Sequence, residues 1–79
     1  MAIIGALVRV DETQRDAARQ NLARLPGVTP FDLDQATRLG LVIEAASLDD
    51  AYQLLNDRIG KVSGVLNVNP VYAHFESGL

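Results

Sequence analysis

The sequence contains no cysteine, no tryptophan and a single histidine, His74. Without cysteine the chain has no disulfide, no thiolate nucleophile and no sulfur ligand for a metal. One histidine with no carboxylate at ligand spacing beside it does not provide a zinc site. We therefore expect no metal site.

Long apolar runs are also absent. No stretch approaches the roughly 18 apolar residues of a membrane span. The apolar start of the chain is interrupted at Arg9 and lacks both the basic segment and the cleavage site of a signal peptide. The sequence predicts a soluble, cytoplasmic protein with no membrane partner.

Basic residues are few and scattered. Seven Lys and Arg stand against ten Asp and Glu, which gives a net charge of −3 and a pI near 4.8. Because nucleic-acid binding needs a basic patch, we expect no nucleic-acid partner. An acidic surface suits a basic partner, although a charge of this size is also common in soluble domains.

The sequence also has no glycine-rich phosphate loop, and no base lies near Ser47, Ser63 or Ser77 along the chain. The pattern favours a binding module with no catalytic residues, so we do not expect an enzyme.

What the chain does contain is an alternation of strand and helix patterns over residues 1–79, the size of one small domain. Apolar segments predict four strands, at 3–10, 28–33, 39–45 and 65–75. Two amphipathic helices lie between them. Asp11 with Gln14 predicts a capping box for the first helix, and Ser47 caps the second. The tail 77–79 is expected to fray.

The order strand, helix, strand, strand, helix, strand predicts an α+β, ferredoxin-like βαββαβ fold. Right-handed crossovers place both helices on one face of a four-stranded antiparallel sheet, with the first and third strands in the middle. Two helices cover only one face of the sheet, so the other face meets water or a partner.

Strand periodicity assigns residues to the two faces. The uninterrupted apolar set of the first strand (Ile4, Ala6, Val8, Val10) is expected under the helices, and in the last strand the parity of Leu66, Val68 and Tyr72 is expected there too. Pro70 and Pro30 predict edge positions, and Pro70 alternatively a bulge. With Ile3, the residues expected on the uncovered face are Gly5, Leu7, Arg9, Val42, Glu44, Asn67, Asn69 and Val71.

The uncovered face combines aliphatic and hydrogen-bonding side chains. Three interpretations are open: a platform for a peptide or helix, a face that pairs with a second copy, or bare surface. A weak homodimer therefore stays open.

Three segments carry a family resemblance: LARLPGV (22–28), LVIEA (41–45) and VSGVLNVNPVYAHFE (62–76). In this order and spacing they resemble the NapD family, small cytoplasmic chaperones for the periplasmic nitrate reductase. Where the family tends to have an aliphatic residue before its Val-Tyr pair, this chain has Pro70.

The resemblance implies a ferredoxin-like fold and a chaperone that performs no chemistry and holds no cofactor. Its partner would be the twin-arginine signal peptide of the nitrate reductase catalytic subunit, retained until the molybdenum cofactor is inserted. Such a ligand would be a basic, partly apolar helix, with the uncovered face and its carboxylate Glu44 as the candidate platform. The peptide's affinity and orientation, and whether cofactor loading is sensed directly, are left open.

Two other functions compete with this one. A small-molecule-sensing regulatory domain of the same fold would dimerise through its sheet and bind its ligand at the interface. A small dimeric oxygenase or isomerase would need a catalytic histidine or acid in a cavity, a role for which His74 is the one histidine.

Overall fold

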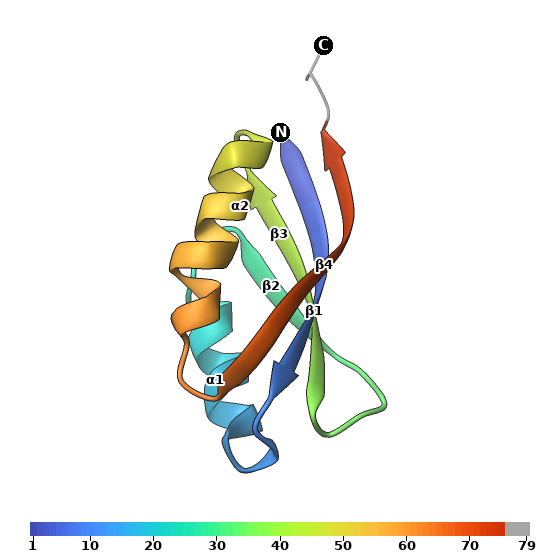
Figure 1. Ribbon diagram of the computed structural model, residues 1–79, viewed down its shortest axis with the longest axis vertical. Helices are drawn as coiled ribbons and strands as arrows, with labels where there is room; N and C mark the ends of the chain where they lie inside the picture. The colour runs from blue at the N-terminus through green and yellow to red at the C-terminus, as the bar shows by residue number, and fades with distance from the viewer. Residues whose placement is uncertain (76–79) are drawn as a thin grey trace.

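The computed structural model describes residues 1–75 and has the predicted order of elements (Figure 1). The expectation for the tail 77–79 lies outside these residues. Two short 3₁₀ turns, η1 and η2, precede α1 and follow α2. The elements are β1 (Ala2–Val10), η1 (Glu12–Gln14), α1 (Arg15–Ala23), β2 (Val28–Asp32), β3 (Arg38–Ala45), α2 (Leu48–Asp57), η2 (Ile59–Lys61) and β4 (Val65–Phe75).

The four strands form one antiparallel sheet in the order β2-β3-β1-β4. The first and third strands are central, as predicted, and both helices lie on the same side of the sheet (Figure 1). The ferredoxin-like α+β prediction is confirmed. The side without helices is called the open face below.

The core lies between the sheet and the helices. β1 alternates without exception between buried residues under the helices and half-buried or exposed residues on the open face. Helix α1 contributes Ala18 and Leu22 to the core, and α2 contributes Ala51 and Leu55. The period-two assignment of β1 and the amphipathic character of both helices are confirmed. Burial of these aliphatic side chains supplies most of the stability of a domain this small.

One of the two predicted helix caps forms. The Ser47 hydroxyl accepts a hydrogen bond from the Asp50 N–H at 3.1 Å. Asp11 instead caps η1, where its carboxylate accepts from the N–H and the hydroxyl of Thr13 and the pKa of Asp11 is lowered by these bonds. The predicted capping box is wrong because the 3₁₀ turn separates Asp11 from α1, and Gln14 accepts a hydrogen bond from the Ser63 hydroxyl instead.

Strand β4 departs from the predicted parity. Its pairing with β1 shifts at two places, which leaves Leu66 and Val71 without a partner residue. The second shift follows Pro70 directly, so Pro70 lies both on an edge strand and beside a bulge. Each inserted residue reverses the faces of the residues beyond it.

The bulges correct the assignment of Leu66 and Tyr72 to the core. Leu66 is 64% exposed, and Tyr72 lies opposite Gly5 on the open face and is 56% exposed. Val68, opposite Val8 and packed against the core, follows the prediction.

An ion-pair cluster joins α1 to the edge strand β2. Arg15 and Arg19 both donate hydrogen bonds to Asp32 Oδ1, at 3.2 and 3.1 Å. Partial desolvation, the largest single effect, raises the pKa of Asp32, but the hydrogen bonds and charges of the two arginines together outweigh it and hold the pKa below its ordinary value.

Candidate functional site on the open sheet face

The strand register arranges the open face in rows across the sheet, since residues paired in an antiparallel ladder point to the same side. From one end to the other, the rows contain Arg38, Arg9 and Asn67; Phe31, Gly40, Leu7 and Asn69; Thr29, Val42, Gly5 and Tyr72; and Glu44, Ile3 and His74. The charged side chains of Arg9, Arg38 and Glu44 stand in the two end rows, and most residues of the two middle rows are apolar.

The apolar middle is flat because of its glycines. A Cβ atom added to Gly40 would lie 2.1 Å from Cζ of Phe31, so the Phe31 ring lies over Gly40. Near the opposite edge of the same face, the Cβ of Tyr72 lies 3.5 Å from where a Cβ on Gly5 would be. Phe31, at 44% exposed, and Tyr72, at 56%, flank the half-buried Leu7 and Val42. These four side chains extend from one edge of the sheet to the other, and we call them the apolar strip.

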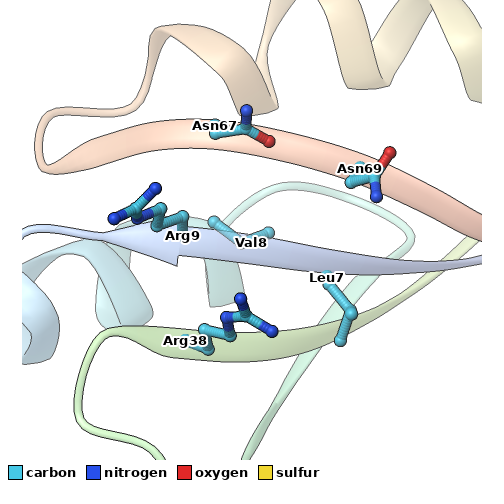
Figure 2. Close-up of a pocket in the computed structure, with 6 residues that line it drawn as sticks. All are labelled: Leu7, Val8, Arg9, Arg38, Asn67 and Asn69. Atoms are coloured by element: carbon cyan, nitrogen blue, oxygen red, sulfur yellow. The ribbon is translucent and has the colours of Figure 1, made fainter.

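A shallow hollow of about 180 Å³ lies at the end of the face where β1 ends and β3 begins (Figure 2). Figure 2 shows Arg9 and Arg38 on the neighbouring strands β1 and β3, and Asn67 and Asn69 on β4. Leu7 and Val8 complete the lining. We call it the arginine hollow.

Arg9 and Arg38 are direct cross-strand partners. Like charges placed opposite each other in a sheet destabilise it. Among residues 1–75 no carboxylate forms a salt bridge with either guanidinium, whereas Arg15 and Arg19 have Asp32. The arginine hollow therefore presents two uncompensated positive charges and the hydrogen-bonding groups of two asparagine amides.

The opposite end of the face carries a negative charge. Glu44 is exposed, and no salt bridge to it forms within residues 1–75. Glu44 and Arg38 belong to the same strand and point to the same side six residues apart, or about 20 Å. The open face is thus positive at one end, apolar in the middle and negative at the other.

The structure brings together four of the eight residues expected on the open face. Leu7, Arg9, Asn67 and Asn69 line the arginine hollow. Gly5, Val42 and Glu44 lie on the same face farther along the strands. Val71 is 59% exposed but has no partner on β1, because it is the inserted residue of the second bulge.

Three prominent residues of the face were not among the expected ones. Arg38 lies one residue before the strand expected at 39–45, yet β3 begins with it. Its even-numbered position, shared with Gly40, Val42 and Glu44, was the available signal. Phe31 follows from the same alternation within β2. Tyr72 could not be found by parity, because the bulge precedes it.

Stacking supports the arrangement at the acidic end. The rings of Tyr72 and His74 lie nearly parallel, with an interplanar angle of 15° and centroids 6.3 Å apart.

In the described part of the chain, His, Asp and Glu side chains nowhere gather in groups of three or more that would ligate a metal. Neither of the helices described here has the length and hydropathy needed to cross a membrane.

Comparison with known proteins places these features in a family. The family model described as NapD protein matches residues 1–77. No curated protein matches the sequence significantly. Among solved structures, the solution structure of the E. coli Tat proofreading chaperone protein NapD is similar, with a TM-score of 0.79 and 23% identity over 96% of this chain and 80% of that one.

Proposed function

The chain belongs to the NapD family, and on that premise we propose that it is a cytoplasmic chaperone for a twin-arginine signal peptide. The client would be the catalytic subunit of the periplasmic nitrate reductase, held back from export until its molybdenum cofactor is inserted. The observation that carries the proposal is the open face, whose apolar strip lies between charged ends. A bacterial signal peptide has a matching pattern, a basic segment followed by an apolar run.

The edges of the sheet favour binding on its face over addition of a strand. Pro30 interrupts the edge strand β2, and Pro70 together with two bulges interrupts the other edge strand, β4. Prolines and bulges are features that prevent a further strand from pairing with an edge.

A peptide bound on the face is best accommodated as a helix. An extended chain on the apolar strip would leave its own N–H and C=O groups against apolar side chains, which is costly for each unpaired group. A helix satisfies these groups internally and presents a stripe of apolar side chains to the strip. The peptide has to be released, so moderate affinity suits this function.

Calorimetric titration tests the proposal directly. The protein is titrated with the twin-arginine leader of a nitrate reductase catalytic subunit and, as a control, with a leader from an unrelated enzyme. We expect heat with the first peptide and much less with the second. Absence of heat with both contradicts the chaperone function.

The variant Leu7→Asp places a charge in the apolar strip and is expected to weaken binding about tenfold or more, since it replaces an apolar contact with a carboxylate that the bound peptide would have to desolvate. The fold should persist, because Leu7 lies outside the helix-covered core. Tyr52→Asp, at an exposed position of α2 on the helix-covered side of the sheet, is the matched control. If both variants bind as tightly as the unmodified chain, the open face is not the platform. If the chain sediments as a dimer that Leu7→Asp dissociates and neither peptide gives heat, the face pairs with a second copy.

A further inference from the structure

The arginine hollow is the one part of the open face that a basic peptide segment does not suit. Arg9 and Arg38 point to the same side from directly paired positions and have no carboxylate bound to them within residues 1–75. The twin arginines of a signal peptide would add like charges there. At the other end Glu44 is the one carboxylate in the rows of the face described here.

Resting on the proposed function, we propose that the arginine hollow is the subsite for the carbonyl end of the signal-peptide helix, and that it fixes the direction in which the peptide binds. The peptide arginines then lie at Glu44, and its apolar run lies on the apolar strip. The helix runs in the same direction as β1, from Ile3 towards Arg9.

The chemistry of the hollow suits the last turn of a helix. The final four carbonyl groups of a helix have no N–H partner within it and carry a partial negative charge. Two guanidinium groups supply N–H donors and the opposite charge, and the Asn67 and Asn69 amides add hydrogen-bonding groups of the same reach. An acidic side chain in that last turn would fit the same hollow.

The dimensions agree with this placement. The two charged ends are separated by about 20 Å along the sheet. A helix rising 1.5 Å per residue covers that distance in about 13 residues. Such a segment has room for the arginine pair at one end and an apolar run of two to three turns, about the length of the short apolar region of a signal peptide.

The direction can be measured with a spin label. The leader peptide of the nitrate reductase catalytic subunit is synthesised with a nitroxide at its N-terminus or, in a second sample, at the end of its apolar run, and added to ¹⁵N-labelled protein. The N-terminal label should broaden the amide signals around Ile3 and Glu44. The second label should broaden those around Arg9, Arg38 and Asn67.

The reversed pattern, or equal broadening of both ends by each label, overturns the proposed direction while leaving the peptide-binding function intact. If neither peptide binds, calorimetry shows it first, and the proposed function fails together with the direction. The two failures are therefore distinguishable.

Charge variants provide a second readout. We expect the double change Arg9→Gln and Arg38→Gln to weaken binding by about three- to tenfold, as expected for two charges at a helix end. Adding one glutamate to the end of the peptide's apolar run should tighten binding to the unmodified chain, and this gain should vanish in the double variant. Arg24→Gln, which removes the same charge from the end of α1, is the matched control. A gain that persists in the double variant shows that the hollow does not contact this end of the peptide.

Discussion

At the scale of single residues, the glycine between α1 and β2 is constrained both by its backbone conformation and by the strand beside it. Gly27 has φ +80°, a left-handed conformation that other residues adopt only with strain. A Cβ there would lie 2.3 Å from the backbone oxygen of Glu44, and the Gly27 carbonyl accepts a hydrogen bond from the Glu44 N–H at 2.8 Å. The residue that forms the acidic end of the open face is thus fixed through its own backbone.

Gly27→Ala should therefore lower the free energy of unfolding by about 2–4 kcal/mol. This combines the strain of an alanine in the left-handed conformation with the cost of displacing the end of β3. Gly60→Ala is the matched control, because a Cβ at Gly60 meets its nearest atom, the Leu55 oxygen, at an ordinary 3.5 Å. Its effect should stay within about 0.5 kcal/mol. Urea unfolding followed by circular dichroism measures both. Equal losses in the two variants contradict the steric explanation.

At the scale of elements, the sequence predicts β1 and β3 more reliably than β4. The two central strands pair in an unbroken register, so period-two alternation gives the faces of Leu7, Arg9, Val42 and Glu44 correctly. In β4 two inserted residues shift the parity, and nothing in the local alternation of Leu66 to Tyr72 distinguishes an inserted residue from a paired one. Bulge positions depend on the neighbouring strand, which a local pattern does not contain.

The ion pairs between α1 and β2 are likewise not predictable from a local sequence pattern. Helical spacing places Arg15 and Arg19 near one another but does not indicate their partner, since Asp32 follows 13 residues after Arg19 in another element. Tertiary packing brings the three side chains together, and their pairing makes this link dependent on pH.

The folded-state pKa of Asp32 is depressed. Its contribution to stability is therefore complete above the ordinary value of about 3.9 and is lost as the pH falls through the lower folded value. We expect the unmodified chain to be more stable than Asp32→Asn at pH 7, and the difference to shrink steadily as the pH is lowered below about 4. Urea midpoints at a series of pH values measure this. Asp34→Asn, in the loop after β2, removes the same charge without breaking the link. A difference that is constant across the series would contradict the ion-pair explanation.

At the scale of the whole molecule, the proposed binding mode sets the stability of the free protein against peptide binding at the facing arginines. Repulsion between Arg9 and Arg38 is unfavourable in the free protein. Proteins commonly retain destabilising arrangements of this kind where a ligand uses them.

Arg38→Gln is accordingly expected to stabilise the free protein by a few tenths of a kcal/mol, at about the size of a cross-strand pair, while weakening peptide binding. The gain in stability should shrink as sodium chloride is raised from about 0.05 to 1 M, because salt screens exposed charges. Thermal unfolding of the free chain measures the change in stability, and calorimetry of the complex measures the change in binding affinity. A variant that loses both stability and binding would show that Arg38 supports the fold.

The interrupted edges of the sheet bear on how selective the protein can be. A strand added to an edge is held by main-chain hydrogen bonds, which every sequence can form, so an open edge would capture extended segments with little regard to their composition. Pro30, Pro70 and the bulges of β4 impede that indiscriminate mode. What remains is a face that distinguishes ligands by their side chains. If the protein acts as proposed and selects one leader among many newly made chains, it benefits from that restriction.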